Sequence, residues 1–223
     1  LTTLNLILPL GISFYTFKTL SYIFDIYNRK MQPCRSLLDY AIFVSFFPTL
    51  LAGPIVRADK FLPQLQYNPV LSSQNLFAGF RFFVIGYFMK MFVADNIANF
   101  VNYVISNASV FNSLTVWIAV IGYSLQIYCD FAGYTSMAIG IAKALGYDLP
   151  ENFNWPYLSR NIAEFWKRWH ITLSEWIRDY LYIPLGGSRK GLKRSCINVL
   201  IAMGLCGLWH GAAWTFVFWG LFH

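Results

Sequence analysis

The sequence predicts an all-α protein that crosses a membrane several times. Of its 223 residues, 57% are hydrophobic and 12% are charged, whereas soluble domains carry about 25% charged residues. The apolar residues recur in long runs along almost the whole chain, so a single buried core does not account for them. A very apolar soluble domain is the weaker alternative.

The distribution of charge supports a multi-pass protein of the inner (cytoplasmic) membrane, in contact with lipid. The net charge is +7, and basic residues gather in short loops at 29–35 and 189–194, a pattern typical of cytoplasmic loops. No nucleic-acid-binding module pattern is present, so we expect no nucleic-acid partner. The four cysteines form no C-x-x-C pair, and we expect no metal. Both ends of the sequence look cut, which predicts one domain, 1–223, incomplete at both ends.

The first candidate span covers residues 4–27. Lys18 is costly at membrane depth unless it snorkels to the surface or finds a partner. Asp25 and Arg29 have the spacing of a helical salt bridge, which we expect to mark the end of the helix. Simple anchoring of the helix end is the favoured interpretation of these charges.

Residues 37–51 form an apolar run that is too short for a full span, which needs about 20 residues. Pro48 and the Gly53-Pro54 pair interrupt it. We expect a helix that is re-entrant or that turns along the interface. Irregular backbone cannot face lipid, so the following segment 55–63 should face headgroups or a water-filled cavity.

Residues 75–107 are long enough for one span plus an interfacial tail. Lys90 and Asp95 are expected at the membrane surface. Arg81 either snorkels or lines an interior cavity, and the sequence leaves both alternatives open.

Residues 113–146 hold two apolar runs with Asp130 between them. A carboxylate in this position is either a paired charge in a helix bundle or a functional group. Gly133, Gly140 and Ala144 supply the small residues that allow helices to pack closely.

Residues 162–180 predict one amphipathic helix at the interface. Arg160, Glu164 and Arg168 form a charged row with a spacing of four. His170 falls on the opposite, tryptophan-rich side, where we expect a partly dry protein interior. The apolar positions are Ile162, Phe165, Trp166, Trp169, Leu173, Trp176, Ile177 and Tyr180.

Residues 184–191 read as a glycine-rich turn, which lacks the strand–loop–helix context of a phosphate site. An apolar helix over 195–207 follows, with His210 at or near its end and a further apolar run at 212–222. His170 and His210 are 40 residues apart (210 − 170), and the turn can bring them together. Each is either a packing group or a functional group, and small neighbours that leave room for a ligand favour function for His210.

The motifs exclude several kinds of histidine chemistry. No G-x-S-x-G nucleophile elbow is present, and neither H-x-x-x-H nor H-E-x-x-H occurs to support a metal site. A neutral imidazole acting as general base remains. It would take a proton from a hydroxyl as that hydroxyl attacks a thioester, without a covalent enzyme intermediate.

Six segments resemble the membrane-bound O-acyltransferases (MBOAT), and among them the bacterial branch of alginate O-acetyltransferase membrane subunits. The D-alanyl transfer proteins of teichoic acid modification belong to the same broader family. The segments are LPLGISFYTF (8–17), FPTLLAGPIVR (47–57), YCDFAGYTSMAIG (128–140), ENFNWPY (151–157), EFWKRWHITLSEWIRDYLYIPLGG (164–187) and GLWHGAAWTFVFWG (207–220).

The resemblance implies a helix bundle around a funnel or tunnel, with the acyl donor entering from the cytoplasm and the acceptor from the other side. It implies that His210 is the catalytic residue and His170 the second histidine of the active site. The chain departs from the family pattern at Ser136, where an acidic residue is expected. We expect supporting or channel-lining roles for Asp130, Trp166, Arg168 and Trp209.

We therefore expect transfer of an acyl group, in the first instance acetyl from acetyl-CoA as a co-substrate, with no bound cofactor. The acceptor would be a hydroxyl of an extracytoplasmic polysaccharide such as alginate, or a periplasmic partner protein. D-alanyl transfer to teichoic acid is the alternative within the family. A transporter or channel, with Lys18, Arg81, Asp130 and the histidines along its path, is the alternative from another class.

Overall fold

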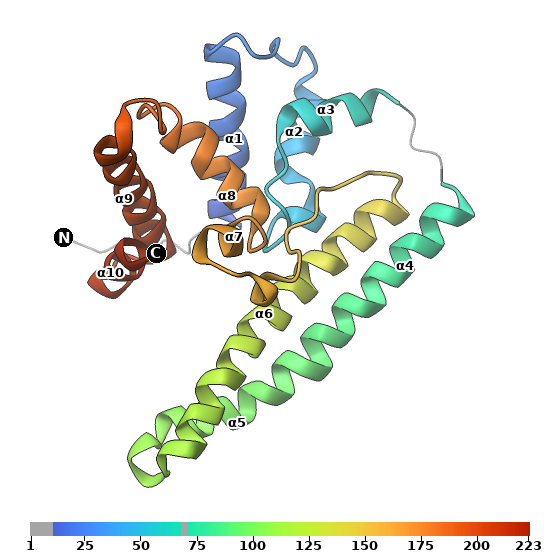
Figure 1. The fold of residues 1–223 in the computed structure, drawn as a ribbon. Helices are drawn as coiled ribbons and strands as arrows, with labels where there is room; N and C mark the ends of the chain where they lie inside the picture. Colours follow the sequence, from blue (N-terminus) through green and yellow to red (C-terminus); the bar gives the residue numbers. More distant parts are fainter. Residues whose placement is uncertain (1–10, 68–70) are drawn as a thin grey trace, which may run out of the picture. The chain divides into compact units, whose positions relative to one another are not determined.

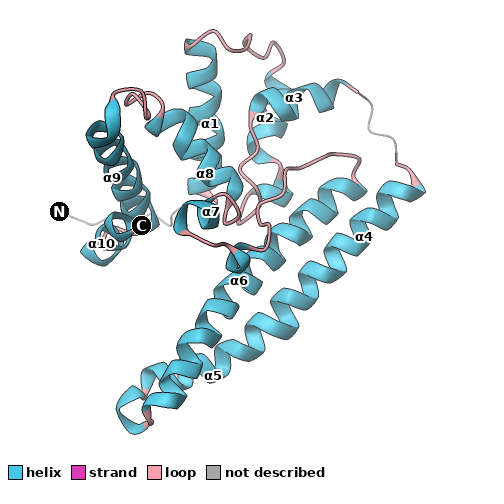
Figure 2. Cartoon of the chain, viewed as in Figure 1, coloured by secondary structure: helices cyan, strands magenta, loops and turns pink. Residues whose placement is uncertain are grey.

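The computed structural model describes residues 11–67 and 71–223, which form helices and connecting loops (Figures 1 and 2). No β-strand occurs within these ranges. In the part of the chain that the structure describes, three helices are long and apolar enough to cross a membrane, namely Ser73–Ser106, Ser113–Ala144 and Gly191–His210. Helices satisfy their own backbone hydrogen bonds, as a lipid environment requires. The all-α membrane fold is thus confirmed.

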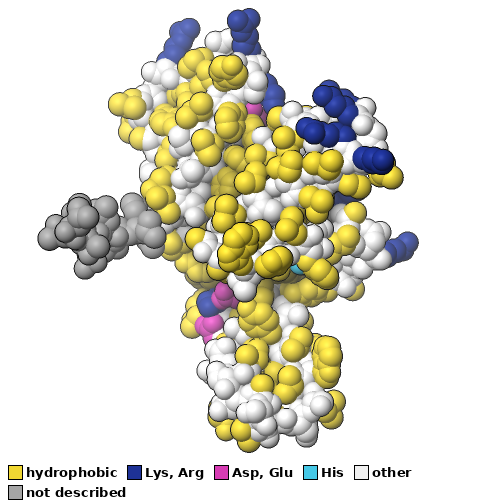
Figure 3. Space-filling view, turned by 90° about the vertical axis from the view of Figure 1, so that its left-hand side faces the viewer, with side chains coloured by type: hydrophobic (Ala, Val, Ile, Leu, Met, Phe, Trp, Pro, Cys, Tyr) yellow, Lys and Arg dark blue, Asp and Glu magenta, His cyan; other side chains and the backbone are white. Residues whose placement is uncertain are grey.

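The surface has the character expected of a protein surrounded by lipid. Hydrophobic side chains are spread over the face drawn in Figure 3, and Lys and Arg side chains gather in a few places. On the long helices, Phe80 is 64% exposed, Trp117 66% and Ile121 61%. Large apolar side chains in such numbers are not left in contact with water by soluble monomers.

The helices group into two compact units. The first, here called the hairpin unit, comprises Leu1–Leu20 and Met31–Glu151. The second, here called the histidine unit, comprises Ser21–Lys30 and Asn152–His223.

Two long antiparallel helices dominate the hairpin unit (Figure 1). One limb is continuous from α4 (Ser73–Tyr87) through a π-helical segment, η2 (Phe88–Ala94), into α5 (Asp95–Ser106). The other limb is α6 (Ser113–Ala144), whose first turn is capped by the side chain of Asn112, which accepts from the Thr115 amide. Both limbs are long and apolar enough to cross a membrane, and the two apolar runs noted within 113–146 form one continuous helix.

Glycines allow the two limbs to touch backbone to backbone. Gly79 faces Gly140, and Gly86 faces Gly133. A Cβ atom on Gly140 would lie 2.6 Å from the carbonyl oxygen of Gly79, and one on Gly133 would lie 2.7 Å from that of Gly86. The predicted close packing through small residues of α6 is confirmed.

The first described helix, α1 (Ile12–Tyr27), carries a buried lysine. Residues 4–10 of the predicted span lie outside the described residues. Lys18 is 1% exposed, and its Nζ donates to Thr49 Oγ1 at 2.6 Å and to the Phe43 carbonyl at 3.3 Å. Anchoring at a helix end is therefore the wrong interpretation of Lys18, because the ammonium group reaches internal acceptors instead.

The partner of Asp25 also differs from the prediction. Its carboxylate accepts from the Tyr180 hydroxyl at 2.6 Å and lies 3.7 Å from Lys30 Nζ. Arg29, the expected partner, has a left-handed backbone with φ of 57°. The helix ends at Tyr27, before Arg29 could align with Asp25 on a helical face.

The apolar run 37–51 is interrupted as predicted, although the helix already ends at Ser45, before Pro48. Helix α2 (Leu37–Ser45) has nine residues, which at about 1.5 Å per residue spans less than half of a bilayer core. A 3₁₀ turn, η1 (Phe47–Thr49), follows with Pro48 inside it. After an extended stretch, α3 (Ala58–Gln66) begins. The depth of this segment in the membrane stays a prediction.

The histidine unit is built of shorter pieces. A glycine turn with positive φ at Gly186 and Gly187 leads into α9, as predicted. The Asn198 side chain donates to the Gly187 carbonyl at 2.9 Å and fastens this turn. The elements are η4 (Pro156–Leu158), α7 (Ile162–Trp166), α8 (Ile171–Ile177), the π-helical η5 (Arg178–Tyr182), α9 (Gly191–His210) and α10 (Trp214–Phe222).

The prediction of one amphipathic helix over 162–180 is wrong. The helix stops after Trp166 and restarts at Ile171, with His170 between them in a left-handed conformation (φ 42°). The Ile171 amide donates to the Asn152 carbonyl at 2.9 Å instead of continuing α7. Hydrogen bonds to a distant loop thus replace the local helical ones, which a periodicity argument does not detect.

Candidate functional site

His170 occupies the most constrained position of the histidine unit. It is the N-cap residue of α8 and is 3% exposed. Its Nδ1 lies 3.0 Å from Asn152 Oδ1. The predicted dry interior is confirmed, although a break in the helix, and not a helical face, places the ring there.

Asn152 fixes which ring nitrogen carries the proton. Its Oδ1 also lies 2.9 Å from Thr172 Oγ1 and 3.3 Å from the Thr172 backbone nitrogen. A backbone N–H can only donate, so the amide oxygen must face it. His170 therefore donates from Nδ1, and its Nε2 carries the lone pair.

The environment keeps His170 uncharged. Burial, with a smaller contribution from the charge of His210, lowers the pKa of His170 from 6.5 to about 3. The ring is thus neutral at any physiological pH. His210 thus acts on the pKa of His170, and the convergence of the two histidines at one site stays a prediction.

His210 ends α9 and is exposed. Its ring centroid lies 4.6 Å from that of Trp209 and 5.0 Å from that of Trp219 on α10. Trp166 lies 5.9 Å from Trp219 and 5.6 Å from His223. His210 thus stands beside an aromatic cluster that joins α7, α9 and α10.

A cavity of about 320 Å³ adjoins this cluster. Its wall is mostly apolar, with Trp166 and Arg178 among the lining residues. The indole N–H of Trp166 is buried and has no hydrogen-bond partner in the described part of the chain. An apolar cavity with a few polar groups is typical of a small-molecule site. Its other lining residues are Ile162, Ala163, Ser174, Ile177, Tyr182, Val199, Ala202, Met203 and His223.

Arg168 holds the turn that precedes His170. Its guanidinium lies 2.7 Å from Glu164 Oε1 and 3.3 Å from the Asn154 carbonyl. Arg160 joins this group through its backbone N–H, which donates to Glu164 Oε2 at 3.0 Å. The three residues contact one another, but Arg160 precedes α7 and Arg168 follows it, so they do not form the predicted row along one helix.

Asp130 belongs to the hairpin unit, where the structure shows the paired-charge alternative. Lys90 Nζ lies 2.5 Å from Asp130 Oδ1 and 2.6 Å from Asp95 Oδ1. Lys90 is halfway along the 34-residue limb Ser73–Ser106. Lys90 lies in the π-helical segment η2, and Asp95 begins α5. The expected position of Lys90 and Asp95 at the membrane surface stays a prediction.

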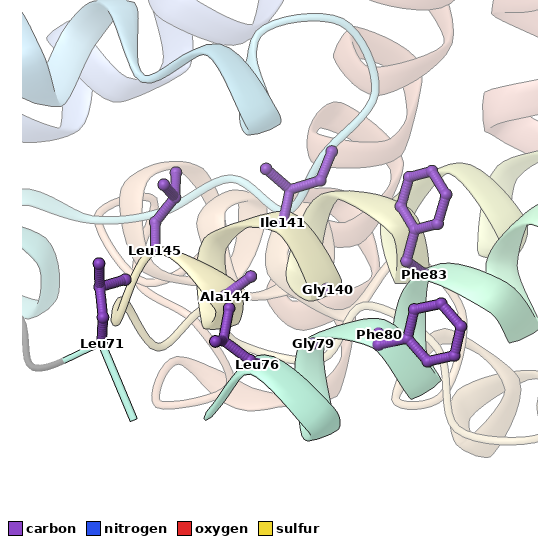
Figure 4. A pocket seen from close by; sticks show the side chains of 9 residues that line it. All are labelled: Leu71, Leu76, Gly79, Phe80, Phe83, Gly140, Ile141, Ala144 and Leu145. Atoms are coloured by element: carbon purple, nitrogen blue, oxygen red, sulfur yellow. The ribbon is translucent and has the colours of Figure 1, made fainter. Parts of the chain in front are cut away.

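A second cavity, of about 640 Å³, lies between α4 and α6 (Figure 4). Leu71, Leu76, Phe80, Ile141 and Leu145 line it with four other apolar or glycine residues. Such a wall offers no acid, base or hydrogen-bonding side chain. Among residues 11–67 and 71–223, no group of three His, Cys, Asp or Glu is placed to hold a metal ion.

Residues 29–223 match the sequence profile of the membrane-bound O-acyltransferase family, MBOAT. The chain belongs to this family. It is 42% identical to the peptidoglycan O-acetyltransferase of Helicobacter pylori over 99% of its length and 47% of that protein. It is 42% identical to the probable alginate O-acetylase AlgI of Pseudomonas aeruginosa, covering 98% of the chain and 42% of AlgI.

A more distant relative carries a different name. The chain is 34% identical to the teichoic acid D-alanyltransferase of Bacillus subtilis, over 98% of the chain and 58% of that protein. This MBOAT chain therefore spans about half the length of the curated relatives that it matches.

Sequence reasoning missed two parts of the site. Asn152 lies in the ENFNWPY segment, and an asparagine in a loop reads simply as a turn residue. Trp219, in the last apolar run, reads as a lipid-facing or core residue. The feature of the sequence that pointed to Asn152 was its place in a segment that resembles the family. That segment did not by itself imply a role for Asn152.

Proposed function

We propose that this protein is a multi-pass inner-membrane O-acyltransferase in which His210 acts as general base and His170 assists it. The observation that carries the proposal is a buried, neutral His170 together with an exposed His210, whose neighbour Trp219 contacts the cavity-lining residues Trp166 and His223. Membership of an acyltransferase family supports the same reaction class.

In the proposed reaction, the acceptor hydroxyl attacks the carbonyl carbon of an acyl thioester. His210 takes the hydroxyl proton as the new C–O bond forms. The C–S bond breaks, and His210 returns the proton to the departing thiolate. His170, with its lone pair on Nε2, accepts a hydrogen bond that orients a substrate group. No covalent enzyme intermediate is required.

The supporting residues have distinct proposed roles. Trp166 and Trp209 form the aromatic wall next to His210. Arg168 keeps the turn before His170 in place. Asp130 braces the hairpin unit through Lys90 instead of contacting substrate.

The names of the relatives support acetyl as the acyl group. The chain is 42% identical to proteins named peptidoglycan O-acetyltransferase and alginate O-acetylase, against 34% for a teichoic acid D-alanyltransferase. We propose acetyl-CoA as the donor, used as a co-substrate without a bound cofactor. The acceptor would be an extracytoplasmic polysaccharide hydroxyl or a periplasmic acyltransferase partner, and D-alanyl transfer is the alternative outcome.

The proposal is tested in vesicles that contain the full-length protein. Transfer of label from radiolabelled acetyl-CoA to polysaccharide is measured for wild type and for His210→Ala. We expect the variant to insert normally and to lose at least about 100-fold in rate. Wild-type rates in His210→Ala would remove His210 from the proposed role, and transfer from a D-alanyl thioester alone would replace the proposed donor.

A further inference from the structure

Two segments that are separated in the sequence, ENFNWPY and the turn that holds His170, form backbone hydrogen bonds with each other. The Ile171 amide donates to the Asn152 carbonyl at 2.9 Å, and the Asn154 amide donates to the Arg168 carbonyl at 2.9 Å. The ENFNWPY segment thus forms a short ladder with the turn that holds His170. Asn152 is 1% exposed, so its side chain is committed to this interior.

The amide oxygen of Asn152 is shared by three donors. They are the Nδ1–H of His170 and the hydroxyl and backbone N–H of Thr172. The two contacts from Thr172 hold the amide group in one orientation, because the backbone N–H has no alternative role. The third contact then fixes both the tautomer and the plane of the imidazole.

Packing alone does not account for an asparagine in this position. Asn152 Nδ2 is buried without a hydrogen-bond partner within the described residues, and an unsatisfied buried donor destabilises a fold. An apolar side chain would avoid that cost but would leave the Nδ1–H of His170 without an acceptor. The amide therefore serves the histidine as well as the first turn of α8.

We propose that Asn152 is a positioning residue for acyl transfer, which keeps His170 in the tautomer whose Nε2 lone pair faces the reaction. This inference rests on the proposed function for the role of His170, but the hydrogen bond itself does not. With the opposite tautomer, Nε2 would donate, and it could no longer accept a hydrogen bond from a hydroxyl or amide of the substrates. The titratable group that acts on the pKa of His170 is His210, at the end of α9.

The hydrogen bond is tested without any activity measurement. The full-length protein is labelled with ¹⁵N-histidine in nanodiscs, and the His170 signals are assigned by difference from His170→Gln. We expect Nδ1 protonated and Nε2 unprotonated in wild type. In Asn152→Leu we expect a mixture of tautomers. Nε2 protonation in wild type, or unchanged signals in Asn152→Leu, would overturn the inference whatever the enzyme transfers.

Transfer kinetics then separate positioning from simple support of the fold. Asn152→Ala should lower kcat about 10- to 100-fold, as removal of groups that orient metal-bound histidines does, with KM changed less than about threefold. Asn154→Ala is the matched control, because Asn154 uses its backbone groups in this ladder. Equal losses in both variants, or a loss explained by less folded protein, would contradict a positioning role.

Asn152→Asp should restore the activity that Asn152→Ala loses. A carboxylate accepts from the same three donors, so most of the wild-type kcat should return. Its negative charge beside Nδ1 should also raise the pKa of His170 and move the acid limb of the pH–rate profile to higher pH. A variant that is active with an unshifted profile would mean that position 152 does not act through His170.

Discussion

The two units handle polar groups among apolar helices in different ways. In the hairpin unit, Lys90 meets the carboxylates of Asp95 and Asp130, so charges are held by opposite charges. In the histidine unit, His170 meets the uncharged amide of Asn152 and is kept neutral by burial. The first arrangement fixes two helices against each other. The second leaves a lone pair that can accept a proton or a hydrogen bond.

The backbone conformation also differs between the two units. The hairpin limbs are long and continuous, and glycines bring them into contact. The histidine unit has short helices, and its left-handed residues include His170 and Trp155. Strained backbone is characteristic of functional sites. The comparison indicates that the hairpin unit is a scaffold and that the histidine unit carries the proposed chemistry.

The largest effect is expected where the scaffold is tightest. Gly133→Leu would place a Cβ atom 2.7 Å from the Gly86 carbonyl oxygen, which should cost about 3 kcal/mol and prevent assembly of the hairpin. Folded protein is measured by size-exclusion chromatography in detergent. Gly122→Ala is the control on the same helix, because its nearest contact is the Val101 side chain at 3.1 Å. Wild-type yield of Gly133→Leu would show that close packing is dispensable.

The next largest effect is the pH dependence of stability that His170 causes in the histidine unit. The folded-state pKa of His170 is about 3, below its ordinary value of 6.5, so the unfolded chain binds the proton first as pH falls. Stability is therefore complete above pH 6.5 and declines toward pH 3, by about 2 kcal/mol between pH 7.5 and 5. Thermal unfolding of wild type and His170→Gln at both values measures this difference. If wild type and His170→Gln lost the same stability between pH 7.5 and 5, a buried neutral His170 would be contradicted.

A smaller effect is expected from the ion pairs of the hairpin. Lys90→Met leaves two carboxylates without their cation and should cost about 1 kcal/mol, because the three side chains are partly exposed. Asp130→Asn should cost less, since Lys90 keeps Asp95 as a partner. Unfolding midpoints in one detergent give the order. A greater loss for Asp130→Asn than for Lys90→Met would assign Asp130 a role beyond this pair.

The smallest effect is expected at Arg168 and Glu164, whose side chains are also partly exposed. Glu164→Gln should lower the unfolding midpoint only slightly, because a solvent-exposed ion pair contributes little to stability. The unfolding midpoint and its dependence on salt measure this effect. A loss that does not diminish in high salt would show that Glu164 acts through its hydrogen bond to the Arg160 amide instead of through charge.

The sequence predicted the scaffold better than the site. Apolar run lengths and small residues such as Gly133 and Gly140 were sufficient for the two hairpin limbs, since these features are local. The sequence did not predict the partner of Lys18 or the break at His170, because both depend on hydrogen bonds to residues far along the chain. His170 and His210 were found as rare polar residues in an apolar sequence. The fixing of the His170 tautomer by Asn152 required the fold.

One measurement tests the division between scaffold and chemistry most directly: acyl transfer per folded molecule for wild type, His210→Ala and Lys90→Met in the same vesicles. We predict that His210→Ala folds like wild type and loses at least about 100-fold in transfer. Lys90→Met should yield less folded protein, with transfer per folded molecule close to wild type. The account would be contradicted if His210→Ala retained transfer, or if folded Lys90→Met lost it.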